Sequence, residues 1–285
     1  MRVHVAREMM TTSNQLPYLL KLLEDESPPV REAVMKQFTS LGPALSDEIK
    51  NLHIALTVGQ RTLLQPLLDV HARGWLKGVW SSWSRLRGDK DKLESALGMI
   101  AEYLGGRLHL TDLTELLDNL TQDFHAAEVP VNAVDLAHFL FHHVGLSGVT
   151  QEDYDNPQNS NLVHTIECKR GIPISLACVY ILVGHRLGLS IEGCNFPGHF
   201  MAIAAIKSRR VLVDCFNSGR LIEQVDFAHI NASITVEDVL RLECRAHTII
   251  ARVLRNLVHA FQQTASHENA HFAQELLSTL EPAGV

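Results

Sequence analysis

The stretch of residues 161–220 constrains the fold more than any other part of the chain. Its first patch, residues 170–176, reads Arg-Gly-Ile-Pro-Ile-Ser-Leu and leads into the apolar run of residues 176–183. Proline is tolerated in the first turn of a helix, because the N–H group that it lacks would be unpaired there. The pattern therefore predicts a buried helix that starts within the first patch and ends near Gly188.

Two further patches predict a β-hairpin after this helix. Residues 197–200 read Pro-Gly-His-Phe, and residues 213–220 read Val-Asp-Cys-Phe-Asn-Ser-Gly-Arg. They lie in or beside the apolar runs 200–206 and 211–213, which the polar residues 207–210 separate. Two strands joined by a polar turn fit this pattern and bring His199 beside Asp214. We therefore expect a helix-plus-sheet core with polar groups at one edge.

Two interpretations of His199 and Asp214 stay open. A buried imidazole and a buried carboxylate stabilise each other without any substrate, so a purely structural pair is one interpretation. A binding or catalytic pair is the other. Among the residues that follow, Gly219 permits a turn, and Arg220 either pairs with an acidic neighbour such as Glu223 or binds an anionic ligand.

The order of a helix start, a strand His and a next-strand Asp resembles the transglutaminase-like (papain-related) superfamily. The patches are most similar to its SirB-type branch, with the signature Gly-Ile-Pro-Ile-Ser-Leu, then Pro-Gly-His-Phe, then Asp-x-Phe-Asn-x-Gly-Arg. All three stand unbroken here, and the resemblance covers roughly residues 93–230. It implies an α+β fold, in which one helix and a small antiparallel sheet form a core flanked by N- and C-terminal α-helices.

The same resemblance implies that the nucleophile is missing. In the superfamily a Cys starts the helix, and a nearby His lowers its pKa. Aligned on Gly171 and on Leu176-Ala177, that position falls on Pro173, which has no nucleophile. The resemblance thus implies a non-catalytic or regulatory protein rather than an enzyme. Such a protein would bind a protein or peptide through the ancestral active-site cleft or through its helical flanks. The family motif around that cleft comprises Gly171, Pro173, Gly198, Asn217, Gly219 and Arg220.

An active hydrolase or amidase is the alternative. It would use Ser175, or a displaced cysteine, together with His199 and Asp214. Ser175 lies in the first helical turn, where a serine also commonly makes a helix-terminus hydrogen bond. Four cysteines are candidates for the displaced nucleophile, and Cys168 is the nearest one upstream of the helix. Cys178 lies inside the apolar helix and is expected to be buried in the core. Cys194 and Cys215 neighbour the His and Asp patches, where each is either a reactive thiol or a small apolar side chain that fills space.

The flanks of this core are expected to be helical. In residues 1–90, Leu16, Leu19, Leu20, Leu22 and Leu23 share one helix face, Pro28-Pro29 can seat the next helix, and the pair resembles a HEAT-type repeat. A boundary near residues 86–92 leads to the transglutaminase-like domain, residues 91–235. Residues 236–285 resemble a TPR-like helical hairpin built from residues 246–261 and 268–280. The three tryptophans Trp75, Trp80 and Trp83 are expected to anchor packing, an exposed aromatic patch being the alternative.

Composition narrows the classes of function. A net charge of −7 argues against nucleic-acid binding, which requires clustered positive charge. Five cysteines without a CxxC pair, together with the absence of a signal-peptide pattern and of a long apolar run, favour a cytoplasmic protein that does not span a membrane. His138 and His142 share a helix face and suggest zinc, but no HExxH motif accompanies them. We expect no metal and no cofactor.

Overall fold

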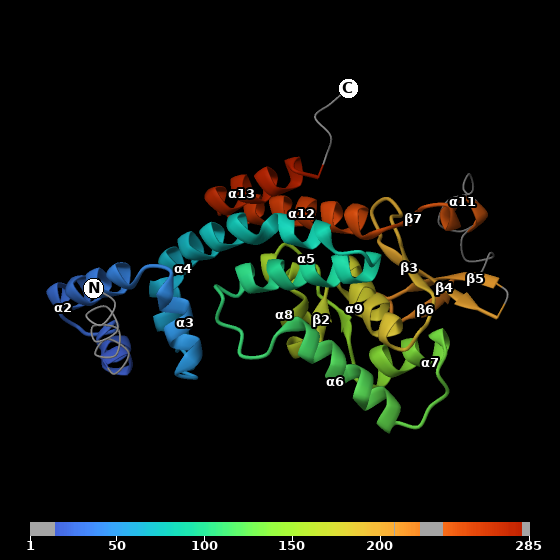
Figure 1. Cartoon of the computed structure of the whole chain (residues 1–285), viewed down its shortest axis with the longest axis horizontal. Helices are drawn as coiled ribbons and strands as arrows, with labels where there is room; N and C mark the ends of the chain where they lie inside the picture. The colour runs from blue at the N-terminus through green and yellow to red at the C-terminus, as the bar shows by residue number, and fades with distance from the viewer. Residues whose placement is uncertain (1–14, 208, 223–235, 281–285) are drawn as a thin grey trace. The chain divides into compact units, whose positions relative to one another are not determined.

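The computed structural model describes residues 15–207, 209–222 and 236–280 (Figure 1). Two compact units divide the chain: the first comprises the chain up to Gly78 together with Glu102–Leu110, and the second comprises Val79–Ala101 and the chain from Thr111 onward. Because a compact unit need not fold on its own, the predicted domain boundary near residues 86–92 stays a prediction.

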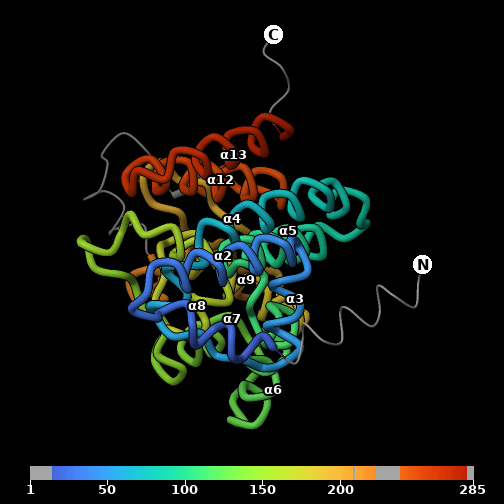
Figure 2. Tube along the Cα trace, turned by 90° about the vertical axis from the view of Figure 1, so that its left-hand side faces the viewer, coloured from blue at the N-terminus to red at the C-terminus, as the bar shows by residue number. Residues whose placement is uncertain are grey.

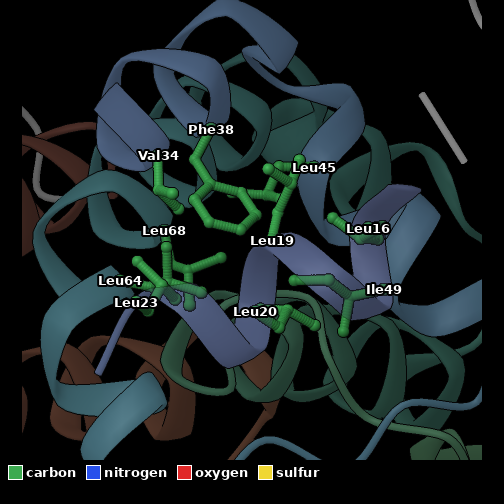
Figure 3. Packing of buried hydrophobic residues seen from close by; sticks show 10 residues of the cluster. All are labelled: Leu16, Leu19, Leu20, Leu23, Val34, Phe38, Leu45, Ile49, Leu64 and Leu68. Carbon is green, nitrogen blue, oxygen red and sulfur yellow. The ribbon is translucent and has the colours of Figure 1, made fainter. Parts of the chain in front are cut away.

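In the described part of the chain, the first unit packs three shorter helices and one long helix around a leucine-rich core. Its helices are residues 15–22, α2 (Pro28–Leu41), α3 (Ala44–Asn51) and most of α4 (Val58–Val79). Pro28 begins α2 as expected, and Gly42 ends it with a positive φ of 56°. Figure 3 shows the ten residues of the core: Leu16, Leu19, Leu20, Leu23, Val34, Phe38, Leu45, Ile49, Leu64 and Leu68.

One residue of the predicted leucine face is not buried. Leu22 is 40% exposed, whereas Leu16, Leu20 and Leu23 are at most 2% exposed. At 100° per residue, Leu22 lies too far around the helix to share the face of Leu16 and Leu20, so including it in that face was wrong. The resemblance of this region to a HEAT-type pair stays a prediction.

The second unit contains most of the helices that surround the buried one. Short helical turns are η1 (Trp80–Arg85), the π-helix η2 (Phe139–His143) and η3 (Pro157–Ser160). The α-helices are α5 (Asp89–Leu104, most of it in this unit), α6 (Leu113–Ala126), α7 (Ala133–His138), α8 (Leu162–Cys168), α9 (Pro173–Arg186), α11 (Val236–Leu240), α12 (Ala246–Gln263) and α13 (His267–Ser278). Side chains of Asp112, Asn132 and Asn161 accept backbone hydrogen bonds at the starts of α6, α7 and α8.

Helix α9 is the buried helix that the sequence predicts. Every residue from Pro173 to Gly184 is buried, and the helix contacts α6, α8, β3 and β4 (Figure 1). The phenol of Tyr180 donates a 2.7 Å hydrogen bond to the carbonyl of Ala133, which satisfies its polar atom inside the core. The helix ends at Arg186, and Gly188 follows with a φ of 71°.

The sheet is small and antiparallel. Its strands are β3 (Ile191–Cys194), β4 (Met201–Ile206), β5 (Arg209–Asp214), β6 (Arg220–Ile222) and β7 (Glu243–Cys244), in the order β6-β5-β4-β3-β7. Strands β4 and β5 form the predicted hairpin, in which Ala202 pairs with Val213. A separate parallel pair joins β1 (Ser147–Gly148) to β2 (Arg170–Gly171), immediately before α9. The α+β fold class is therefore confirmed.

The C-terminal helices complete this unit. Helices α12 and α13 run side by side (Figures 1 and 2), as the predicted hairpin requires, while its likeness to a TPR stays a prediction. The indole N–H of Trp80 donates to Thr279 Oγ1 at 3.1 Å, and Trp80 and Trp83 are both buried, so these two tryptophans anchor packing as expected. Among the described residues, no helix has the length and apolar character needed to cross a bilayer.

Candidate functional site

His199 and Asp214 meet where β4 begins and β5 ends. Because Ala202 lies opposite Val213, His199, two residues before β4, and Asp214, the last residue of β5, come to the same end of the hairpin. His199 Nε2 lies 2.8 Å from Asp214 Oδ1. The side chain of Asp214 is 9% exposed and that of His199 is 31% exposed, so the imidazole reaches solvent while its partner is buried.

Asn217 fixes the carboxylate of Asp214. Its backbone N–H donates to Oδ1 at 3.2 Å, and its side-chain amide donates to Oδ2 at 2.7 Å. Burial alone would raise the pKa of Asp214, but the hydrogen bonds from His199 and Asn217 together hold it below its ordinary value. Asp214 is therefore an ionised acceptor in the folded protein at neutral pH.

An ionised Asp214 decides the tautomer of the neutral imidazole. A carboxylate only accepts, so Nε2 of His199 must carry the proton and Nδ1 becomes the acceptor. Within the described part of the chain, no hydrogen bond engages Nδ1. The imidazole is thus held in the orientation and tautomer that a general base or a peptide-binding acceptor needs.

The ring of Phe216 lies between the imidazole of His199 and the β1–β2 strand pair, which precedes α9. Its ring meets the ring of His199 edge-on at 6.1 Å between centroids, and it meets the ring of Tyr154 in the same manner at 6.5 Å. The ring also lies against Gly148 in β1, where an added Cβ would stand 2.6 Å from Phe216 Cε2. Gly148 pairs with Gly171 in β2, two residues before Pro173. A half-buried aromatic surface therefore extends from His199 toward the start of α9.

The other motif residues lie around these elements. Pro173 is the first residue of α9, after an extended Ile172 that makes no side-chain cap. Gly198 and Gly219 adopt positive φ values of 78° and 69°, which favour glycine. Arg220 begins β6 opposite Asp214 in the strand register. Its expected partner Glu223 lies outside the described residues.

The hydroxyl of Ser175 is engaged elsewhere. Ser175 is fully buried in the first turn of α9, and Oγ donates a 2.6 Å hydrogen bond to the carbonyl of Asn159. Among the described residues, no hydrogen bond joins Ser175 to His199. Ser175 therefore makes a tertiary hydrogen bond to η3, and not the helix-terminus hydrogen bond that is common for a first-turn serine.

Four of the five cysteine thiols are buried. Burial raises the pKa of Cys194 to about 11 and of Cys244 to about 12, and it also raises the pKa of Cys178 and Cys215 above the ordinary value. Cys168 is exposed, and its Sγ lies 3.5 Å from Nδ1 of His164 rather than at His199. A thiol with a raised pKa is a poor nucleophile at neutral pH, so the cysteines beside the His and Asp patches serve packing.

The histidine pair on α7 and η2 shows no metal geometry. The rings of His138 and His142 stack at 4.9 Å between centroids, which places both on one face as expected. In the described ranges, no group of three or more His, Cys, Asp or Glu side chains is arranged to hold a metal ion.

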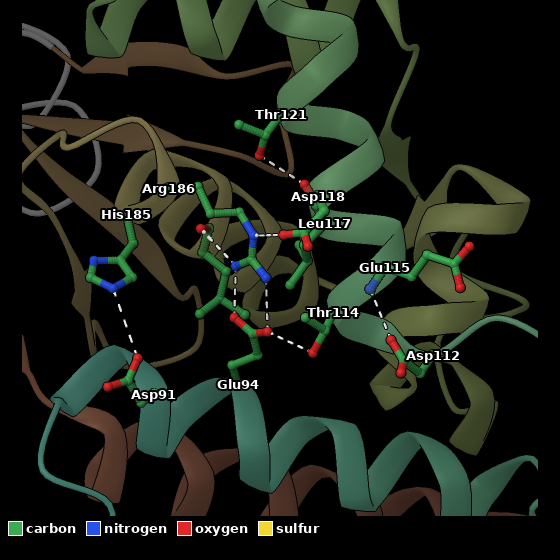
Figure 4. Close-up of polar contacts among 11 residues, drawn as sticks. Asp91, Glu94, Asp112, Thr114, Glu115, Leu117, Asp118, Thr121, His185 and Arg186 are labelled. Atoms are coloured by element: carbon green, nitrogen blue, oxygen red, sulfur yellow. Dashed lines mark hydrogen bonds and ion pairs between the residues drawn. The ribbon is translucent and has the colours of Figure 1, made fainter.

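A polar cluster that sequence patterns did not indicate ties α9 to α5 and α6 (Figure 4). Both terminal nitrogens of Arg186 bind the carboxylate of Glu94, at 2.7 and 2.8 Å, and Nε binds Asp118 at 2.6 Å. Thr114 donates to Glu94 at 2.9 Å, and His185 lies 4.0 Å from Asp91. The only sequence signal is that a basic residue ends an apolar helix, because Glu94 lies 92 positions away.

Comparison with known proteins agrees with this architecture. A profile of the transglutaminase-like superfamily matches residues 107–255, which contain both His199 and Asp214. A UPF0162 protein of Xylella fastidiosa strain 9a5c is 29% identical over 217 residues, which cover 72% of this chain and 77% of that protein. The UPF0162 protein of strain Temecula1 / ATCC 700964 is 32% identical over the same shares of both chains.

A shorter similarity joins the chain to a larger protein. F-box only protein 21 of Mus musculus is 39% identical over 49 residues, which cover 17% of this chain and 8% of that protein. No solved structure matches the chain significantly. The profile match spans more than half of the 285 residues, and the helix-plus-sheet core with its His–Asp pair lies inside it. The chain belongs to the transglutaminase-like superfamily.

Proposed function

We propose that this chain is a SirB-type member of the superfamily that has lost its nucleophile and binds a protein or peptide at the His199 site. In this proposal Pro173 occupies the position of the lost cysteine. The observation that carries it is the contrast between a His199–Asp214 pair whose imidazole reaches solvent and candidate nucleophiles that are engaged or buried elsewhere. Catalysis by acyl transfer needs a nucleophile within reach of the base, whereas binding does not.

The geometry around His199 suits a peptide. Nδ1 can accept a hydrogen bond from a peptide N–H, because Asp214 holds the proton on Nε2. The half-buried rings of Phe216 and Tyr154 supply an apolar surface beside this acceptor. A site that combines one oriented polar group with aromatic surface can fix both the position and the side-chain type of a bound segment.

A hydrolase or amidase that uses Ser175 or a displaced cysteine remains the alternative, and the acceptor nitrogen of His199 is the observation that favours it. Labelling at neutral pH with a fluorophosphonate and with iodoacetamide separates the two. The binding proposal expects no residue whose labelling depends on His199. Labelling of Ser175 or of any cysteine that is abolished by His199→Ala would establish the alternative.

Binding itself is tested by panning a random peptide library against the wild-type chain. Selected peptides should bind the wild-type chain and a His271→Ala variant equally, and the His199→Ala variant at least about tenfold more weakly. His271 is an exposed histidine on α13, so its removal controls for the loss of an imidazole. Equal binding by the His199→Ala variant would contradict the proposal. We also propose a cytoplasmic location, which the five free thiols support.

A further inference from the structure

A second thiol and imidazole lie together outside the His199 site. Cys168 ends α8 and His164 lies one turn earlier, so both side chains share one face of the helix. Sγ of Cys168 lies 3.5 Å from Nδ1 of His164, within reach of an S–H···N hydrogen bond. Cys168 is the exposed thiol of the five, all of which lie in described residues, and it has no disulfide partner.

The pair lines a pocket of about 380 Å³ that contains charges of both signs. Arg170 lines it on one side, with one guanidinium nitrogen on the carbonyl of Gly148 at 3.1 Å and its other nitrogens directed to no partner that the structure describes. Asp153 and the amide side chain of Asn156 line it as well. A cation and an anion beside a thiol suit a small zwitterion that carries a carboxylate and an ammonium group.

We propose that Cys168 and His164 form a thiol-exchange site, at which small zwitterionic disulfides bind and leave a reversible mixed disulfide on Cys168. Nδ1 of His164 takes the thiol proton while Sγ attacks one sulfur of the disulfide. The new bond joins Sγ to that sulfur, the original S–S bond breaks, and the leaving thiolate takes the proton from His164. The disulfide is the oxidant, and one thiol is released for each thiol consumed.

The environment of His164 supports its role as the proton acceptor. Partial burial lowers the pKa of His164, and the charge of Glu167 acts in the opposite direction. The imidazole is therefore mainly neutral at pH 7 and can accept the proton of Cys168. This function needs neither His199 nor Asp214, so it goes beyond the proposed peptide binding.

The test uses the full chain and oxidised glutathione at pH 7, with intact mass and peptide mapping as the readout. The wild-type chain should gain one glutathione, mapped to Cys168 and removed by a reductant. His164→Ala and His164→Asn should each slow the reaction about a hundredfold, the lower end of what general-base catalysis contributes. His199→Ala and His271→Ala should react at the wild-type rate. The Asn variant keeps a polar side chain that is not a base, so equal slowing of the two variants assigns the effect to the missing base rather than to the missing polarity.

A second comparison separates a recognised ligand from simple exposure. Arg170→Gln should slow the reaction with oxidised glutathione and leave the reaction with uncharged 2-hydroxyethyl disulfide unchanged. Wild-type rates in both His164 variants would overturn the proposal, and so would equal slowing of both disulfides by Arg170→Gln. Loss of reactivity in His199→Ala would overturn it too, and it would assign Cys168 to the hydrolase alternative instead.

Discussion

Replacing Arg186 by Ala should destabilise the unit that holds the sheet. Arg186 joins the end of α9 to Glu94 on α5 and Asp118 on α6 (Figure 4). The side chains of Arg186 and Glu94 are only 16% and 18% exposed, so water screens this two-point contact weakly. Asp118 is 53% exposed, so its contact with Arg186 is screened and contributes little.

The magnitude follows from these contacts. Hydrogen bonds to charged groups contribute about 1.5–3 kcal/mol net, and the solvent-exposed pair adds about 0.5 kcal/mol. Removal of Arg186 also takes away the cation that pairs with the largely buried Glu94. Within the cluster, the carboxylate of Glu94 then keeps only the hydrogen bond from the hydroxyl of Thr114. The free energy of unfolding should therefore fall by about 3 kcal/mol in Arg186→Ala. Arg186→Lys, which keeps the charge but cannot make the two-point contact, should lose about half of that.

Urea unfolding, followed by the fluorescence of the buried tryptophans of this unit, measures the change. A double-mutant cycle of Arg186→Ala with Glu94→Ala should give a coupling energy of about 2 kcal/mol. The matched control is Arg241→Ala, because Arg241 is 80% exposed and its contact with Asp238 is 3.5 Å long; it should change stability by less than about 0.5 kcal/mol. A coupling energy near zero, or Arg186→Lys equal to the wild type, would refute the reasoning.

The other predictions concern the His199 site and the core. The pKa of Asp214 in the folded protein lies below its ordinary value, so the ionised carboxylate stabilises the fold at pH values above the unfolded-state pKa. This stabilisation is lost as the pH falls through the folded-state pKa. The urea midpoint should therefore fall less steeply between pH 7 and pH 3 in Asp214→Asn than in the wild type. Gly148→Ala should displace the ring of Phe216, which a Cβ would approach to 2.6 Å, and shift the NMR signals of the His199 ring; unchanged signals would show that Phe216 does not position the imidazole. Tyr180→Phe should cost about 1 kcal/mol of unfolding free energy, because it removes a buried hydrogen bond, and a neutral effect in urea would contradict the assigned hydrogen bond.

The features that sequence patterns predicted correctly are local ones. The continuous apolar run after a first-turn proline identifies α9, and the polar turn between two apolar runs identifies the hairpin of β4 and β5. A hairpin fixes its own register over a few residues, which is why His199 and Asp214 were predicted to lie side by side. Pro28 at the start of α2 was also predicted from a local rule, since proline fits the first turn of a helix.

The features that patterns could not give are contacts between distant segments. The partner of Ser175 is a backbone carbonyl 16 positions away, and the partner of Arg186 lies 92 positions away; neither periodicity nor turn chemistry carries such information. The ring of Phe216 lies on Gly148 for the same reason, since the tertiary fold alone brings them together. The exposure of Leu22 is a different case, because the helical angle alone predicts it once the face is measured.

Cys168 shows how the two kinds of information interact. The resemblance to a superfamily with a Cys–His pair suggests His199 as the partner of any displaced cysteine. The spacing of four residues instead places Cys168 beside His164 on one face of its helix. Each imidazole therefore has a different partner: His199 has an oriented carboxylate, and His164 has an exposed thiol. Because acyl transfer of the papain type needs both partners on one imidazole, separating them favours binding at the first site and thiol exchange at the second. Substitution of either histidine should thus weaken one property and leave the other at its wild-type level.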